Sequence, residues 1–240
     1  MCHLVRLCPS QTSTITSPAS CSFAASQGGA APVSAPEEYS ATTAMPTSLS
    51  NEPGSSQASS LGTNRQSSSI PLSSPDKLPQ HQSAANNVWV YPSEQMFFNA
   101  MKRKGWEPNE VDMHSVVSIH NTVNERAWQE VMAWERMHCA SCPEPKLKKF
   151  MGRPADLSPK ARILNLAGFG LPFDRHDWIV DRCGQEVRYV IDFYNGAPTQ
   201  GALAPAMFLD VRPALDSFQA VYDRLRMQLG WLTSMRWRGE

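Results

Sequence analysis

The sequence predicts an α+β fold: helices come first, a small antiparallel sheet follows, and a last helix closes the chain. Three observations lead to this prediction. Apolar residues recur at three- and four-residue steps between residues 93 and 138, which is the period of one helix face. Residues 178–212 instead alternate in the manner of strands. The helical period then returns between residues 213 and 229.

The composition divides the chain at about residue 87. Residues 1–87 hold only 7 of the 44 charged residues and 2 of the 21 aromatic residues, whereas the other 153 residues hold all 7 tryptophans. A segment this poor in large apolar side chains cannot bury enough surface to offset its chain entropy. We therefore expect a disordered Ser/Thr/Pro-rich tail over residues 1–87 and one folded domain over residues 88–240.

Charge and cysteine content exclude several classes of protein. The 22 basic and 22 acidic residues balance, so nothing indicates a nucleic-acid surface. No apolar run approaches the roughly 18 residues that a membrane-spanning helix needs. The six cysteines are irregularly spaced and do not predict a disulfide scaffold, and Cys139-x-x-Cys142 alone is at most half of a zinc site. Gly-rich nucleotide loops and Ser/His/Asp motifs are absent from the sequence.

The first helices have recognisable start and stop signals. Ser93 is a plausible N-cap, and Gly105 follows the last apolar position of that helix, as a C-terminal glycine does. The next helix is expected to begin near Asn109 or Asp112. Residues 146–162 are basic and rich in proline and glycine, so we expect a loop whose charges are solvated, bind the acidic groups of a ligand, or face an acidic partner.

The second half predicts strands and a closing helix. Residues 178–182 and 186–194 alternate around Cys183-Gly184, which indicates an antiparallel hairpin, and residues 207–212 form a third strand. Pro213 is expected to open the last helix. Its predicted buried face consists of Leu215, Phe218, Val221, Tyr222, Leu225 and Leu229.

The stretch 119–128 concentrates polar and aromatic residues between apolar runs, and its local structure has two interpretations. In one interpretation the helix is continuous, and His120 lies at the edge of its apolar face. That face would consist of Val116, Ile119, Val123, Ala127 and Trp134. Alternatively, residues 122–125 (Thr-Val-Asn-Glu) form a capping box, which would start a new helix and place His120 at a helix–helix junction. The junction is the favoured interpretation.

The chemistry of His120 is also open at this point. An imidazole at an apolar edge can bind heme iron. It can equally be a partly buried histidine that is hydrogen-bonded to Asn121 or Asn124. The local pattern favours the second interpretation.

Five blocks of sequence change that balance: WVYPSEQMFFNAMKRKGW, IHNTVNERAWQEV, GRPADLSPKARI, LPFDRHDWIVDRCGQEVRYVIDFY and LDVRPALDS. In order between Trp89 and Ser217, they resemble the cytochrome c heme lyase (holocytochrome c synthase) family. The resemblance implies an enzyme that binds heme b as a substrate, together with the N-terminal segment of apocytochrome c. It then joins the heme vinyl groups to the thiols of the Cys-x-x-Cys-His motif in that segment.

The resemblance also implies roles for individual residues. His120 would be the axial ligand of the heme iron, and His120, Asn121 and Glu125 the catalytic set. Trp89, Asn121 and Glu125 would contact heme, and His176 would be a second histidine linked to heme binding. Since thiol addition needs no enzyme nucleophile, catalysis can rest on positioning.

Location and a rival function follow from the same resemblance. The expected location is the mitochondrial inner membrane, peripheral and facing the intermembrane space, without a cleaved presequence. Only Arg6 supplies positive charge in the first 36 residues, which suits this expectation. Cys8-Pro9 is followed by Ser10, where the family's N-terminal heme-regulatory motifs usually have valine. The alternative function is a non-enzymatic heme-binding or heme-trafficking protein of the same fold.

Overall fold

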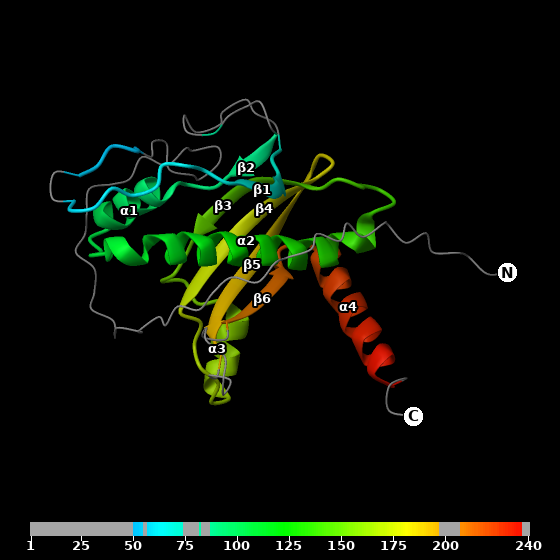
Figure 1. Cartoon of the computed structure of the whole chain (residues 1–240). Coiled ribbons are helices and arrows are strands. Elements are labelled where there is room, and N and C mark those ends of the chain that lie inside the picture. The colour runs from blue at the N-terminus through cyan, green and yellow to red at the C-terminus, as the bar shows by residue number, and fades with distance from the viewer. Residues whose placement is uncertain (1–49, 55–56, 74–81, 83–86, 197–206, 237–240) are drawn as a thin grey trace.

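The computed structural model of the chain describes residues 50–54, 57–73, 82, 87–196 and 207–236, and Figure 1 shows their arrangement. The elements confirm the predicted α+β class. In chain order they are β1 (Ser67–Pro71), β2 (Val88–Val90), α1 (Glu94–Arg103), η1 (Glu110–Asp112), α2 (Met113–Glu135), η2 (Arg136–His138), β3 (Lys146–Gly152), α3 (Pro159–Leu166), β4 (Asp174–Arg182), β5 (Gln185–Asn195), β6 (Met207–Pro213) and α4 (Phe218–Arg236).

A four-stranded antiparallel sheet in the order β3-β4-β5-β6 forms the centre of the molecule. Strands β4 and β5 pair along their whole length, from Asp174 opposite Phe193 to Arg182 opposite Gln185. The turn between them contains Cys183 and Gly184, both with positive φ. The predicted hairpin and the predicted third strand are therefore confirmed.

The long helix α2 lies across one face of this sheet (Figure 1). Because side chains alternate along a strand, every second residue of β4 and β5 points toward α2. These side chains and those of α2 make one buried apolar core, to which β1 and β2 also contribute. Its buried members include Ile70, Trp89, Tyr91, Ala127, Trp128, Val131, Trp178, Val180, Tyr189, Ile191 and Phe193.

The opposite face of the sheet is charged although it is buried. Asp177 is completely buried and accepts hydrogen bonds from Arg153, Arg175 and Arg188. A buried carboxylate is tolerated only when it is paired in this way. The sheet therefore has a mainly apolar layer on the α2 side and a layer of ion pairs on its opposite face.

A second buried carboxylate on that face positions α3. Asp192 pairs with Arg212 at 2.5 Å and accepts a hydrogen bond from Ser158 at 2.6 Å. Ser158 is also the N-cap of α3, because its hydroxyl accepts from the Ala161 amide. The start of α3 is thus attached to the back of the sheet, and the helix extends away from it (Figure 1).

Part of the predicted tail is folded. Residues 67–71 form β1, which pairs with β2, and Leu61 is buried against Phe98 and Met113. Local composition missed these contacts because each one joins the segment to residues far along the chain. The prediction of disorder is wrong for these residues, and residues 1–49, including Cys8-Pro9, lie outside the described part of the chain.

Two further expectations need correction. Residues 146–152 form the edge strand β3 and residues 159–166 form α3, so the expected basic loop is mostly regular structure. Pro213 ends β6, and α4 begins only at Phe218. The face of this helix that we expected to be buried is exposed: Phe218 is 97% and Leu229 is 62% exposed.

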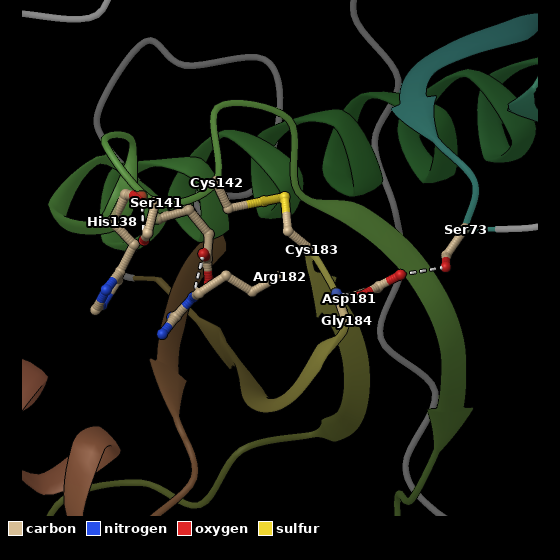
Figure 2. The surroundings of a disulfide bond; sticks show 9 residues. Ser73, His138, Ser141, Cys142, Asp181, Arg182, Cys183 and Gly184 are labelled. Carbon is tan, nitrogen blue, oxygen red and sulfur yellow. Dashed lines mark hydrogen bonds and ion pairs between the residues drawn. A yellow bond between two sulfur atoms is a disulfide. The ribbon is translucent and has the colours of Figure 1, made fainter.

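The C-terminal end of α2 is attached to the β4–β5 hairpin by a disulfide bond between Cys142 and Cys183 (Figure 2). Next to it, Glu135 makes two hydrogen bonds with the Arg182 guanidinium, at 2.7 and 2.8 Å. The sequence analysis did not predict the disulfide bond.

None of the helices in the described residues has the length and the apolar character that crossing a membrane requires.

Candidate functional site

The candidate site is built on the middle of α2. The helix runs without a break from Met113 to Glu135, and the Thr122 hydroxyl donates to the Ser118 carbonyl inside it. Residues 122–125 therefore lie inside one helix and do not start a new one, so the predicted junction at His120 is wrong. The buried stripe also differs from the expected one, since Ile119 is exposed and Val117, Asn121 and Trp128 are buried.

His120 lies between two aromatic rings and two amide side chains. The edge-on rings of Phe97 and Tyr91 have centroids 4.9 and 6.1 Å from the imidazole. Nδ1 is 3.3 Å from Asn121 Oδ1, and Nε2 is 3.2 Å from Asn124 Nδ2. These partners assign one tautomer: Nδ1–H donates to Asn121, and the Nε2 lone pair accepts from Asn124.

Burial keeps this imidazole neutral. Desolvation lowers the pKa of His120 to about 4, against the hydrogen bond that the ring donates to Asn121, which acts in the opposite direction, and with a further lowering by the charge of His176. At neutral pH the ring is therefore unprotonated at Nε2, whose lone pair accepts the hydrogen bond from Asn124. A neutral imidazole is the form that binds a metal.

His176 lies on the α2 face of β4 and affects the titration of His120, so the two predicted histidines belong to one region. Its Nε2 is 3.2 Å from Asp174 Oδ2, and its ring packs edge-on against Phe193 at 5.1 Å. Its Nδ1 is buried and has no hydrogen-bond partner among the described residues. With Nε2–H donated to Asp174, Nδ1 presents an unused lone pair.

Glu125 points to the neighbouring strand β1. It accepts hydrogen bonds from the Ser69 amide at 3.0 Å, from the Ser69 hydroxyl, and from the Tyr91 hydroxyl at 2.9 Å. Burial, and then the adjacent carboxylate, raise the pKa of Tyr91 well above its ordinary value. Glu125 therefore fixes Tyr91, whose ring contacts His120, and so supports the histidine indirectly.

Asn121 and Trp89 are both buried. Asn121 Nδ2 donates to Gln66 Oε1 at 3.0 Å, which fixes the amide so that its oxygen faces His120. Trp89 lies in the main core with its ring edge-on to Phe150 at 5.2 Å. In this structure Trp89 is part of the support beneath the site.

The structure adds two groups that the sequence analysis did not assign to the site: Phe97 and Tyr91, which form the aromatic border of His120. The hydrogen bond expected between His120 and Asn124 is confirmed at Nε2, since residues four apart are neighbours on a helix. Gln66 gave no signal, since β1 was not predicted.

The donor set suits heme iron better than a free metal ion. Among the described residues, no cluster of three or more His, Cys, Asp or Glu side chains could hold a metal. Heme iron needs only one or two ligands from protein because the porphyrin supplies four. A single neutral imidazole bordered by aromatic rings fits that requirement.

Comparison with known proteins places the whole arrangement in one family. The model of the cytochrome c/c1 heme lyase family matches residues 4–228. A putative holocytochrome-c1 synthase of Schizosaccharomyces pombe is 48% identical over 181 residues, which is 75% of this chain and 76% of the relative. The holocytochrome c-type synthases of Bos taurus and Homo sapiens are 48% and 47% identical; the alignments cover 73% of this chain and 62% and 63% of those proteins. No solved structure matches the chain.

A neutral histidine on the central helix of an α+β fold is thus the candidate site of this chain. The chain belongs to the cytochrome c/c1 heme lyase family. Its length falls short of the bovine and human relatives, of which it spans less than two thirds.

Proposed function

We propose that the chain is a holocytochrome c synthase that attaches heme b to apocytochrome c. Membership of the heme lyase family supports the enzyme class. The observation that carries the heme site is His120, which is neutral, oriented by two amides and bordered by two aromatic rings. Among the described residues it is the histidine with a markedly lowered pKa.

The reaction adds a thiol to a heme vinyl group. A sulfur–carbon bond forms at one vinyl carbon, and the thiol proton ends on the other, so no oxidant or leaving group is needed. The Cys-x-x-Cys-His segment of the substrate brings both thiols and a histidine for the second axial position. The protein then has to hold heme and substrate in register, which is catalysis by positioning.

Individual residues take roles within that scheme. His120 binds iron through Nε2, which requires Asn124 to release its hydrogen bond. Asn121 keeps the proton on Nδ1 and fixes the plane of the ring, as outer-shell groups do for metal-binding histidines. Glu125 acts through Tyr91, and the free Nδ1 of His176 is a second polar contact for heme.

We place the protein at the mitochondrial inner membrane as a peripheral protein that faces the intermembrane space. The disulfide between Cys142 and Cys183 supports the side of the membrane. Disulfides form and persist in oxidising compartments and are rare where glutathione and thioredoxin keep thiols reduced. A cytosolic or matrix location would leave this bond reduced.

The test compares two histidines of the same helix. His120→Ala should lose most bound heme and most thioether product when coexpressed with apocytochrome c. The matched control is His114→Ala, because His114 is exposed and pairs with Glu94 away from the site. Heme per protein and covalent product per protein are measured in both variants. Normal product from His120→Ala would refute the axial assignment, and heme binding without any product in the wild type would favour a heme-trafficking function instead.

A further inference from the structure

Two exposed apolar projections remain unexplained by the proposed site. The first, the α3 tip, comprises residues 163–171 at the end of α3 and the loop after it. The second, the α4 end, comprises residues 225–232. Large exposed side chains form both: Ile163, Leu166, Phe169 and Leu171 in the α3 tip, and Leu225, Leu229, Trp231 and Leu232 in the α4 end. Leu166 is 88% exposed, which is unusual for a leucine next to three other exposed apolar residues.

The topology brings the two projections to the same side of the molecule. The loop after α3 leads directly into the start of β4, so the α3 tip lies at that end of the sheet. Strand β6 runs toward the opposite end, where Pro213 pairs with Tyr189, and α4 then turns back. Figure 1 shows α3 and α4 extending beyond the sheet in the same direction, toward the lower side of the view.

The α4 end is exposed on all sides of the helix. The first turns of α4 are attached to the rest of the fold: Asp223 pairs with His138, and Arg224 donates to the Pro213 carbonyl. Residues 228–233 are all exposed, and consecutive residues of a helix point in all directions. A groove on a partner protein would cover one side of such a helix, whereas a bilayer can surround it.

Charge is also one-sided in both projections. Residues 159–173, which include the α3 tip, contain two basic residues and no acidic one, and the α4 end contains one arginine, Arg226, and no acidic residue. Lys160 is partly neutralised by Asp210 at 2.7 Å, whereas Arg162 and Arg226 are exposed. Basic residues near an anionic lipid surface are attracted to it.

We propose that the α3 tip and the α4 end together dock this protein on an anionic phospholipid bilayer. Their leucine, phenylalanine and tryptophan side chains enter the boundary between headgroups and acyl chains, and their arginines contact lipid phosphates. Apolar residues flanked by arginine are the composition of interfacial membrane helices. The inference names the surface for the peripheral membrane contact and rests on that part of the proposed function.

The first test is flotation of the full-length protein with vesicles of four parts phosphatidylcholine to one part phosphatidylglycerol. The wild type should float, and pure phosphatidylcholine vesicles should retain clearly less. The triple variant Leu225→Gln, Leu229→Gln, Trp231→Gln should weaken binding roughly tenfold or more, because three apolar side chains no longer enter the bilayer. These positions are exposed, so the substitutions do not disturb the core.

The α3 tip is tested in the same way and against a matched control. Leu166→Gln with Phe169→Gln should also weaken flotation roughly tenfold, and combining both sets should abolish it. The control, Trp106→Gln with Val111→Gln, alters equally exposed apolar residues near the start of α2 and should float like the wild type.

Several outcomes would overturn the proposal: no flotation of the wild type, equal flotation with neutral vesicles, or an equal loss in the control variant. Sedimentation of the lipid-free protein could give a further contradicting outcome. If the wild type formed a dimer and did not bind vesicles, and if the variants of the α3 tip and the α4 end disrupted that dimer, these projections would be a contact between copies of the chain. Heme loading and thioether formation measured without vesicles should be unchanged in all variants, so a failure of the proposed catalytic function would be seen separately.

Discussion

The two halves of α2 are held in different ways. At the C-terminal end, Glu135 is almost completely buried and pairs through two hydrogen bonds with Arg182, and the Tyr189 hydroxyl donates to the same carboxylate at 2.6 Å. The Cys142–Cys183 bond lies beside them (Figure 2). In the first half, His120 is held by amide hydrogen bonds of 3.2 and 3.3 Å and by ring edges.

This difference separates anchoring from binding. A buried ion pair and a covalent bond are costly to break, so they fix α2 on the sheet. A neutral hydrogen bond has a net contribution of only about 1 kcal/mol, so a ligand that bonds to His120 can replace the one from Asn124. The C-terminal end of α2 is therefore firmly attached to the sheet, whereas in its first half the hydrogen bond to His120 can be replaced by a ligand.

The largest expected effect comes from breaking the ion pair. Arg182→Met should destabilise the fold by about 3–5 kcal/mol, because it leaves the Glu135 carboxylate buried without its cation. Urea unfolding followed by circular dichroism measures the change. Lys148→Met is the control, since its partner Glu186 is exposed and a solvent-exposed ion pair contributes little to stability. Equal losses in both variants would contradict the anchoring role.

Removing the disulfide should have the next largest effect. Cys183→Ser opens a link between residues 41 apart and should cost about 2–4 kcal/mol of stability under oxidising conditions. Cys139→Ser, which removes a free cysteine, should have little effect. Heme loaded per folded protein should remain at the wild-type level in both, because the substrate supplies the reacting thiols. A folded Cys183→Ser protein that binds heme but forms no thioether would assign this cysteine a chemical role.

The lowered pKa of His120 should make the stability of the fold depend on pH. The pKa of His120 is about 4 in the folded protein and near its ordinary value when unfolded, so the unfolded state binds the proton first as the pH falls. Stability should therefore decrease between about pH 6.5 and pH 4, by up to about 1.4 kcal/mol per pH unit. Unfolding of the heme-free protein across this range measures the slope. His120→Gln should flatten it, and an unchanged slope would contradict the burial of this ring.

The smallest expected effect is at Glu125. Glu125→Gln keeps the size of the side chain but loses one of the oxygens that accept from Ser69 and Tyr91, at a cost of about 1 kcal/mol. Heme per protein should fall, whereas thioether formed per bound heme should not. Tyr91→Phe should give the same pattern if Glu125 acts through Tyr91. Full heme loading with no thioether in Glu125→Gln would instead make this carboxylate part of the chemistry.

Local signals predicted the fold where the determinants were local. The Ser93 cap, the end of α1 before Gly105 and the Cys183-Gly184 turn depend on residues a few positions apart, and all three are confirmed. The start of α4 was predicted too early, because Pro213 suits both the first turn of a helix and the end of an edge strand.

Long-range pairings could not be predicted in this way. Strand β3 is an edge strand rich in lysine, a composition that protects edges from aggregation but resembles a loop. Strand β1 is defined by its pairing with β2 and by Glu125, 56 residues after Ser69. For the site, the family resemblance predicted Trp89, His120, Asn121, Glu125 and His176, and the structure shows the contacts that these side chains make.

The disulfide also has a consequence for how the chain matures. Three cysteines lie in the described part of the chain, so three pairings are open to them, and the native one spans 41 residues. Cys139 and Cys142 are only three residues apart, and short loops close with the least entropic cost. Oxidation before α2 has docked on the hairpin would therefore favour the wrong pair. Attack by the Cys183 thiolate on Cys142 would then restore the native bond and release Cys139. The yield of correctly oxidised protein should thus depend on a thiol–disulfide buffer that keeps such exchange open until the sheet has formed.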